Sequence, residues 1–333
     1  MPPPLRFGIL GCASIARRMM LPAFAEVPEA VPVAVASRCQ EKAESFAAEF
    51  KIDAAPDYDT LLARDDIDAV YLPLPPALHE QWTLRALAAG KHVLCEKPLT
   101  TSLASAKRLV TAARSADRML AENWMFLYHQ QLEVIDALIA ERELGPLRLL
   151  RANFGFPALD AANFRYRREL GGGALLDAGG YTLRVARHFL GDSLRLVGSV
   201  LETPTGSSVD RFGAVLLSGE ASGTAQLAFG FDTFYQCELQ LWFASGRITA
   251  PRIFTAPPGL ATEITLETAD GRESIMVAPD NHFAGSLRDF ANRVAEHRPD
   301  FSGLLVQACL VDEILISSAA GVSSENSSRS LHD

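Results

Sequence analysis

The chain has 333 residues, of which 48% are hydrophobic and 21% are charged. These values are typical of a globular protein, and the length exceeds what one hydrophobic core usually organises, so we expect two domains. The 40 acidic and 31 basic side chains leave a net charge of −9, which argues against nucleic acid or an anionic membrane surface as a partner.

Several sequence features narrow the class of protein further. No apolar run reaches the roughly 18 residues that span a bilayer, and the N-terminal residues lack the basic-then-apolar layout of a signal peptide. The five cysteines are widely spaced without a Cys-x-x-Cys pair, and no group of potential metal ligands has a suitable spacing. We therefore expect a cytoplasmic protein with reduced thiols, no membrane contact and no metal.

Short apolar runs alternate with helical patterns over the first third of the chain. Strands separated by helices imply crossover connections and a parallel sheet. The pattern predicts an α/β fold whose N-terminal domain, residues 1–123, is a Rossmann-type doubly wound parallel sheet. The predicted strands are Leu5–Leu10, Val31–Ala36, Ala69–Leu74, His92–Cys95 and Met119–Glu122, and the helices are Ser14–Ala25, Gln40–Phe50, His79–Ala89 and Ser102–Ser115.

The pattern changes after this point. One more helix, Gln131–Glu141, precedes a long strand, Leu147–Phe156, and β-rich stretches separated by turn residues run from Arg195 to Val277. Consecutive strands without intervening helices predict an open, mostly antiparallel sheet in a C-terminal α+β domain, residues 124–322. Helices over Phe283–Glu296 and Leu304–Ala319 close this domain, and a polar tail, residues 323–333, follows.

The turn after the first strand reads Gly11-Cys12-Ala13-Ser14-Ile15-Ala16. This is a Gly-x-Ala-x-x-Ala version of the dinucleotide fingerprint, in which small residues let the pyrophosphate approach the backbone and the helix N-terminus. Because Ala13 replaces the central glycine, the match is degraded, and a small-residue turn before a packed helix is the alternative. Its position between the first strand and the first helix favours dinucleotide binding.

The second strand ends at Ser37-Arg38, where an NAD-preferring site usually has an acid that binds the ribose 2′-hydroxyl. Ser37 can donate a hydrogen bond to a 2′-phosphate, and Arg38 can pair with it. The alternative is that Arg38 is a solvated surface residue. We predict NADP(H) as the cofactor.

Two later segments identify a family. Glu96-Lys97-Pro98 follows the predicted strand His92–Cys95, and Gly171–Tyr181 reads Gly-Gly-Gly-Ala-Leu-Leu-Asp-Ala-Gly-Gly-Tyr. Together with the fingerprint, they resemble the two motifs of the glucose–fructose oxidoreductase/inositol dehydrogenase family (Gfo/Idh/MocA). The likeness extends to about Ala319, and it implies NADP-dependent oxidoreduction of a sugar-like substrate.

One departure from the family motif separates its branches, because Tyr181 stands where many members have histidine. In this respect the chain resembles dihydrodiol dehydrogenases and the nucleotide-sugar 3-ketoreductases of deoxysugar biosynthesis. Stretches such as Glu122–His129, Phe164–Tyr166 and Gln307–Asp312 look closest to the latter. The resemblance implies NADPH-dependent reduction of a keto group, at C-3, on a dTDP-linked 3-keto-6-deoxyhexose.

Three residues are candidates for the chemistry. Lys97, at the carboxyl edge of the sheet, can stabilise charge that develops on a ketone oxygen. Tyr181 can give the proton, since the reference pKa of a tyrosine is about 10 and the phenol is protonated at neutral pH. Asp177, four residues earlier, either orients Tyr181, binds a sugar hydroxyl or caps the helix. The alternatives are a solvated lysine and a packing tyrosine.

The remaining candidates are contacts with the cofactor or substrate. We expect the cofactor to meet the fingerprint residues, Ser37 and Arg38, together with Leu72, Pro73, Leu74, His79, Glu96, Lys97, Asn123 and Arg165. We expect a substrate surface formed by Lys97, Trp124, Phe126, His129, Phe156, Asp177 and Tyr181, although aromatic clusters at this spacing are more often core. The basic run Arg165–Arg168 suits a nucleotide diphosphate or is a solvated loop.

Two other functions stay open at this point, namely a free-sugar or dihydrodiol dehydrogenase that uses NADP and a non-catalytic NADP-binding regulator. We also expect a homo-oligomer, a dimer or tetramer, because an open antiparallel sheet leaves one face free to pair with a second subunit.

Overall fold

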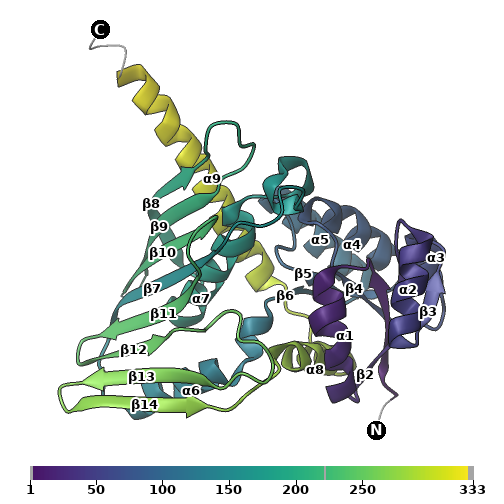
Figure 1. The fold of residues 1–333 in the computed structure, drawn as a ribbon, viewed down its shortest axis with the longest axis horizontal. Coiled ribbons are helices and arrows are strands. Elements are labelled where there is room, and N and C mark those ends of the chain that lie inside the picture. Colours follow the sequence, from purple (N-terminus) through teal and green to yellow (C-terminus); the bar gives the residue numbers. More distant parts are fainter. Residues whose placement is uncertain (1–2, 221–222, 329–333) are drawn as a thin grey trace. The chain divides into compact units, whose positions relative to one another are not determined.

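The computed structural model describes residues 3–220 and 223–328 (Figure 1). They form two compact units. The first comprises the described residues up to His129 together with Asn281–Leu305, and the second comprises Gln130–Asp280 together with the described residues from Val306 onward. The predicted fold class, a Rossmann-type parallel sheet followed by an α+β domain with a mostly antiparallel sheet, is confirmed.

The described part of the first unit is built on a six-stranded parallel sheet in the order β3-β2-β1-β4-β5-β6. This order reverses direction between β1 and β4, and ligands of such sheets bind at the carboxyl ends of the strands at that point. The strands are β1 (Leu5–Leu10), β2 (Ala30–Ala36), β3 (Asp53–Ala55), β4 (Ala69–Leu72), β5 (His92–Glu96) and β6 (Leu120–Asn123).

Helices α2 (Gln40–Phe50), α3 (Tyr58–Leu62), α4 (His79–Ala88) and α5 (Leu103–Ala116) connect these strands. The apolar sides of α3, α4 and α5 meet strand residues such as Leu10, Val70 and Val93 in a buried core. The sequence analysis missed β3 and α3, which have only three and five residues and therefore little periodicity.

The first helix is less regular than predicted. In place of one helix over Ser14–Ala25, a π-helical stretch, Ala16–Met20, leads into α1 (Leu21–Ala23) and a 3₁₀ turn, Phe24–Glu26. The N–H of Leu21 donates to the carbonyl of Ala16, five residues back, and the next residue, Pro22, has no N–H to donate. The α-helical ladder is therefore interrupted at this point.

Helix α8 (His282–Ala295) belongs to the first unit, whereas the sequence analysis assigned everything after Asn123 to the second domain. The ring of Phe290 lies 5.8 Å from the ring of Phe7 on β1, and the Ser286 hydroxyl donates to Asn123 at 2.5 Å. An amphipathic pattern shows that a helix has a buried face, but not which sheet it covers, so sequence alone did not reveal this return of the chain.

The second unit contains an eight-stranded sheet in the order β14-β13-β12-β11-β7-β10-β9-β8. Every neighbouring pair is antiparallel except β7 and β10, which run parallel. The strands are β7 (Leu147–Phe156), β8 (Leu194–Glu202), β9 (Phe212–Gly219), β10 (Thr224–Phe231), β11 (Gln236–Phe243), β12 (Gly246–Ala250), β13 (Thr262–Thr268) and β14 (Gly271–Val277). The sequence analysis predicted β7 and a β-rich region, Arg195 to Val277, in which nearly all of the other seven strands lie.

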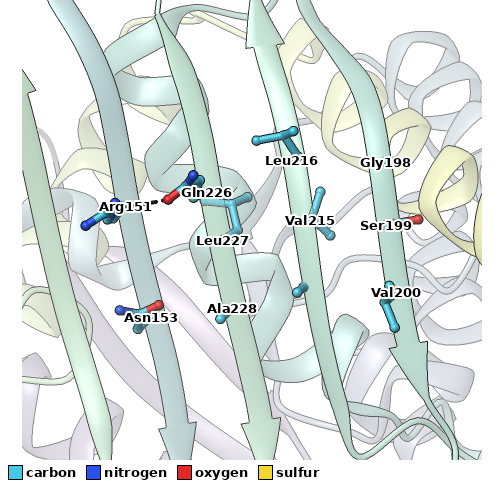
Figure 2. A pocket seen from close by; sticks show the side chains of 11 residues that line it. Arg151, Asn153, Gly198, Ser199, Val200, Val215, Leu216, Gln226, Leu227 and Ala228 are labelled. Atoms are coloured by element: carbon cyan, nitrogen blue, oxygen red, sulfur yellow. Dashed lines mark hydrogen bonds between the residues drawn. The ribbon is translucent and has the colours of Figure 1, made fainter.

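Helices α6 (Gln130–Glu141), α7 (Gly180–Leu190) and α9 (Ser302–Ser328) pack on one face of this sheet (Figure 1). The other face is uncovered and has a hollow of about 590 Å³ over β7–β10, shown in Figure 2. Several large apolar side chains of the strands are exposed, among them Val200 (64%), Trp242 (53%) and Met276 (64%).

Helix α9 corrects the expectation that no segment is apolar enough to span a bilayer. Its window Ser302–Ala319 meets that test of length and composition, with a mean hydropathy of 1.4. Within the second unit, however, Gln307 donates to the carbonyl of Gly180 and accepts from Arg187, and Ser318 bonds Ser199 on β8. These polar contacts join α9 to α7 and to β8. The helix continues through Ser328 into the predicted tail, whose last residues, 329–333, lie outside the described residues.

Candidate active site

Gly11 ends β1 in a conformation that favours glycine, with φ +116°, and its N–H donates to the Ala36 carbonyl. A Cβ at this position would lie 2.8 Å from Leu74 Cδ2 in the loop after β4. The turn therefore brings bare backbone to the point where the sheet order reverses. The following residues, Cys12 to Ile15, lead into the first helical turn, where free N–H groups suit a pyrophosphate, so this segment fits a dinucleotide.

Ser37 and Arg38 follow β2. Ser37 is buried, and its hydroxyl accepts a hydrogen bond from the Cys39 N–H at 3.3 Å. Arg38 is exposed, and its guanidinium pairs with no carboxylate of the described residues. An uncompensated arginine in the place of the usual acid fits a ribose 2′-phosphate.

The loop after β4 contains Leu72, Pro73 and Leu74, and His79 begins α4. The His79 ring is fully buried, with Nε2 2.7 Å from the Leu74 carbonyl and Nδ1 2.8 Å from the Pro98 carbonyl. Burial lowers the pKa of His79 to about 4, although both carbonyls favour the protonated form. The ring lies between two backbone carbonyls and joins the loop after β4 to the loop after β5, so both of its nitrogens are engaged by protein atoms.

Glu96, the last residue of β5, is the centre of a buried hydrogen-bond network. Its Oε1 accepts from the Tyr71 hydroxyl and from Asn123 Nδ2, both at 2.7 Å, and Asn123 Oδ1 accepts from the Ser286 hydroxyl. Burial raises the pKa of Glu96, and the bonds from Tyr71 and Asn123 and the charge of Lys97 offset only part of this effect. The network joins the carboxyl ends of β4, β5 and β6 with α8.

Lys97 follows this network directly, and the residues on both sides of it are anchored. The Pro98 carbonyl contacts His79, and the Leu99 N–H donates to Glu122 Oε1 at 2.7 Å. The Lys97-Pro98 peptide bond is cis. The backbone that presents the Lys97 ammonium is thus held on both sides, at the edge where ligands of parallel sheets bind.

In the second unit, the three consecutive glycines Gly171–Gly173 lie in close contact with the loop that precedes them. A Cβ at Gly172 would lie 2.4 Å from the Arg165 carbonyl oxygen, which accepts a hydrogen bond from the Gly173 N–H. At Gly173 a Cβ would meet Asp210 Oδ1 at 2.4 Å, and the other carboxylate oxygen of Asp210 accepts from the Leu175 N–H. Only glycine allows this approach, which places Arg165 beside the helical turn that contains Asp177.

Asp177 lies within a π-helical turn, Leu175–Gly179, which runs into α7, so it is not the predicted helix cap. Its Oδ2 accepts from Arg165 Nε at 2.6 Å, and both side chains are largely buried. Burial lowers the pKa of Arg165, but the charge and hydrogen bond of Asp177 outweigh it and raise the pKa above the usual value. Single-turn π segments are frequent at functional sites.

Tyr181 lies in the first turn of α7. Its ring is 5% exposed and packs edge-on at 5.0 Å from the ring of Phe154 and at 5.7 Å from the ring of Phe254. These contacts fix the plane of the phenol, and Arg165 is near enough for its charge to act on Tyr181.

The predicted aromatic substrate surface is largely core. Trp124 and His129 are nearly buried and Phe126 is fully buried, so the Phe126 ring cannot face a sugar without rearrangement. Phe156 is half-buried against Phe231, with the ring centroids 4.9 Å apart. Aromatic residues spaced in this way are more often packed than exposed.

The basic run divides in two. Arg165 is committed to Asp177, whereas Arg167 pairs with Glu169 at 2.7 Å and Arg168 donates to the Ser208 carbonyl. The last two are exposed, which agrees with the solvated-loop alternative rather than a diphosphate clamp.

Sequence reasoning missed Tyr71, Glu122, Asp210 and Ser286, which support the candidate residues rather than stand among them. The first three lie in or next to strands that the sequence predicted. For Tyr71 and Glu122, a polar group in an otherwise apolar strand could have indicated a buried hydrogen bond. Ser286 gave no signal, because its partner Asn123 is far away in sequence.

Residues 5–124 match the family described as "Oxidoreductase family, NAD-binding Rossmann fold", and residues 133–249 match the family described as "GFO/IDH/MocA C-terminal domain". Both matches fall on the units described above.

Curated relatives cover nearly the whole chain. A dTDP-3,4-didehydro-2,6-dideoxy-alpha-D-glucose 3-reductase from Saccharopolyspora spinosa is 44% identical over 87% of this chain and 88% of its own length. The enzyme of the same name from Streptomyces violaceoruber is 42% identical over 93% and 94%. Among solved structures, KijD10, a 3-ketoreductase from Actinomadura kijaniata in complex with NADP and TDP-benzene, has a TM-score of 0.91 at 39% identity, with 94% of this chain and 98% of that chain covered.

The buried Glu96 generates a prediction about pH and stability. Since burial raises its pKa, the folded chain holds the Glu96 proton more tightly than the unfolded chain does. The free energy of unfolding contributed by this group is therefore greatest below the unfolded pKa and falls as the pH rises through the folded pKa. In Glu96→Gln the amide oxygen can still accept both hydrogen bonds but does not titrate. We expect this variant to gain stability relative to wild type as the pH rises above the unfolded pKa of about 4, measured by urea unfolding.

Glu80→Gln is the matched control, because a hydrogen bond from Arg108 lowers the pKa of Glu80. That carboxylate stabilises the fold above its unfolded pKa, so the difference between this variant and wild type should change with pH in the opposite direction. Parallel pH profiles of wild type and Glu96→Gln would contradict the raised pKa.

Proposed function

The chain belongs to the Gfo/Idh/MocA oxidoreductase family, and we propose that it uses NADPH to reduce the C-3 keto group of a dTDP-linked 3-keto-6-deoxyhexose in deoxysugar biosynthesis. The observation that supports this proposal most is the identity above 40%, over most of both chains, with two dTDP-sugar 3-reductases. The site residues described above have the chemistry that such a reduction needs.

The cofactor, when bound, supplies the hydride. The turn at Gly11 receives the pyrophosphate on bare backbone, and Ser37 and Arg38 receive the 2′-phosphate. Among the other predicted contacts, the structure supports the backbone around Leu72–Leu74 and Lys97 better than the side chain of His79, whose two ring nitrogens face protein carbonyls.

Lys97 has the role of an electrophile. Its ammonium donates a hydrogen bond to the ketone oxygen, on which negative charge grows as the carbon is reduced. Glu96 is not a proton carrier in this proposal, because its carboxyl is engaged by Tyr71 and Asn123. Its role is to hold the strand end that presents Lys97.

Tyr181 has the role of proton donor in the reduction. Its ring is held by Phe154 and Phe254, and a neutral phenol can give a proton at physiological pH. Arg165 stabilises the phenolate that remains, because its positive charge interacts with Tyr181. Asp177 holds Arg165 and is in our proposal a positioning residue rather than an acid or base.

We also propose that the chain forms a homo-oligomer through the uncovered face of the eight-stranded sheet and that it acts in the cytoplasm. Exposed Val200 and Trp242 on that face, and the hollow beside Val200 in Figure 2, support a partner there. The five cysteines are all free, as in reducing compartments.

The direct test is oxidation of NADPH, followed by absorbance, with dTDP-3,4-didehydro-2,6-dideoxy-glucose as substrate and with free glucose and xylose plus NADP⁺ in parallel. We expect turnover with the nucleotide sugar alone. Turnover with the free sugars alone would identify a sugar dehydrogenase, and cofactor binding without any turnover would indicate a regulator.

In the same assay Lys97→Ala should lower kcat by roughly two to three orders of magnitude, as loss of one oxyanion donor does. Lys107→Ala is the control, since Lys107 is an exposed lysine of α5 in the same unit. An unchanged kcat in Lys97→Ala would remove Lys97 from the mechanism.

Arg38→Ala should lower kcat/KM with NADPH by roughly tenfold to a hundredfold and leave kcat/KM with NADH nearly unchanged, because one charge-assisted contact to the 2′-phosphate is lost. Arg85→Ala, an exposed arginine that pairs with Asp59, is the control. An unaltered ratio of the two cofactors would show that Arg38 does not bind the 2′-phosphate.

For the assembly, sedimentation velocity should give a dimer or tetramer for the wild type and a smaller species for Val200→Glu, because a charge on the uncovered face resists burial. A wild-type monomer at micromolar concentration would refute the proposed interface.

A further inference from the structure

A second cavity, of about 220 Å³, lies in the first unit at the amino ends of β5 and β6. This is the edge of the parallel sheet opposite to Glu96 and Lys97, which end and follow β5. The end of α5, the end of α8 and the turn before β6 line it. The lining residues that matter here are His92, Arg114, Arg118, Arg293, His297 and Phe301.

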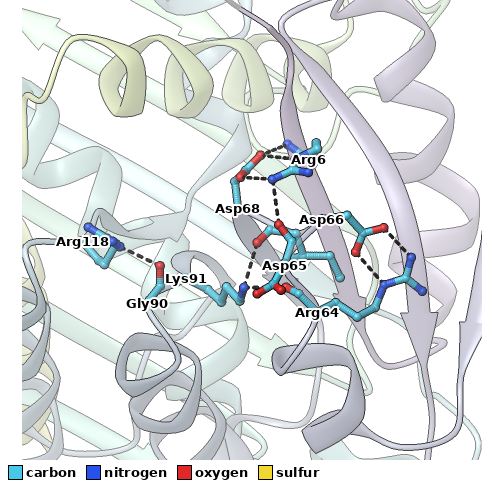
Figure 3. Close-up of polar contacts among 9 residues, drawn as sticks. Arg6, Arg64, Asp65, Asp66, Asp68, Gly90, Lys91 and Arg118 are labelled. Carbon is cyan, nitrogen blue, oxygen red and sulfur yellow. Dashed lines mark hydrogen bonds and ion pairs between the residues drawn. The ribbon is translucent and has the colours of Figure 1, made fainter.

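Arginines dominate this cavity although the chain as a whole is acidic. Of the described residues that line it, three are arginines and one, Asp117, is an acid. Arg118 donates from Nε to the Gly90 carbonyl at 2.6 Å (Figure 3). It also donates from Nη1 to the Asp117 carbonyl at 2.8 Å, so backbone holds its guanidinium in place. Arg114 lies 5.8 Å from the ring of Phe301. Neither pairs with a carboxylate in the part of the chain that the structure describes.

The acids of the neighbouring loop do not compensate these arginines. Asp68 accepts two hydrogen bonds from the Arg6 side chain, and Asp66 accepts two from Arg64, as Figure 3 shows. Arg293 has a carboxylate, that of Asp289, only at 3.7 Å. Arg114 and Arg118 therefore keep their charge without a paired carboxylate among the described residues, whereas Arg293 is paired and Asp117 is an acid of the lining.

His92 adds a neutral donor. Its Nδ1 accepts from the Met119 N–H at 2.9 Å, so the proton of the neutral ring is on Nε2. Burial, helped by the charge of Arg118, lowers the pKa of His92 to about 4, and the ring is neutral at pH 7. The guanidinium groups and the imidazole N–H of this cavity are all hydrogen-bond donors. An oxyanion can accept hydrogen bonds from such donors.

We propose that this cavity is a binding site for a phosphate group, carried by inorganic phosphate or by a phosphate monoester, and separate from the cofactor and substrate sites. Arg114, Arg118 and Arg293 provide the charge, and planar guanidinium groups match the geometry of phosphate oxygens. A volume of about 220 Å³ admits a phosphate group with several waters, each of which occupies about 30 Å³.

The test is calorimetric titration of inorganic phosphate, and separately of glucose 1-phosphate, into the full chain saturated with NADP⁺ at constant ionic strength. Bound NADP⁺ occupies the phosphate sites of the cofactor, and the arginine variants below distinguish binding in this cavity from binding in the substrate site. We expect saturable binding, and the tighter of the two probes identifies the source of the phosphate group.

Arg114→Gln should weaken this binding by roughly tenfold or more, as loss of a charge-assisted hydrogen bond does. Arg108→Gln is the matched control on the same helix, because Arg108 pairs with Glu80 outside the cavity and should bind phosphate as wild type does. If Arg114→Gln has a lower Tm than wild type without phosphate, Arg293→Gln replaces it. No saturable binding to the NADP⁺-loaded wild type, or wild-type affinity in the arginine variants, would overturn the proposal.

Discussion

A carboxylate buried at the carboxyl edge of the parallel sheet is the constraint on which the first unit's site depends. Burying the Glu96 carboxylate costs free energy, and hydrogen bonds from the hydroxyl of Tyr71 and the amide of Asn123 offset part of that cost. Because those partners come from β4 and β6, and Asn123 is bonded in turn by Ser286 of α8, the network ties three strand ends and one helix together. This network fixes the backbone position of Lys97, the next residue in the chain.

In the second unit, a close approach between two backbone segments positions the candidate residues. The glycine triplet lets the Arg165 loop lie against the turn before α7, at distances that any side chain at Gly172 would prevent. That contact puts the guanidinium of Arg165 on the Asp177 carboxylate. The family motif is thus a packing requirement as much as a catalytic one, and Tyr181 depends on it because the same turn begins its helix.

The two edges of the parallel sheet serve different chemistry. At the carboxyl edge, glycine and small residues leave backbone open near the switch between β1 and β4, which suits a dinucleotide. At the amino edge, Arg6 and Arg64 neutralise the aspartates of one loop, while Arg114 and Arg118 lack such partners among the described residues. In a protein with a net charge of −9, this edge therefore offers guanidinium groups to an anion.

The sequence by itself determined the fold class and most of the strands, and it marked Lys97, Asp177 and Tyr181 as candidates, since strand periodicity and short motifs are local properties. Their roles remain proposals. Only the tertiary structure decided that α8 returns to the first unit, that Asp177 pairs with Arg165 and that Phe126 is core. These facts depend on which surfaces meet between segments that are far apart in sequence. Such contacts decide burial and hydrogen-bond geometry, and a local sequence pattern does not specify them.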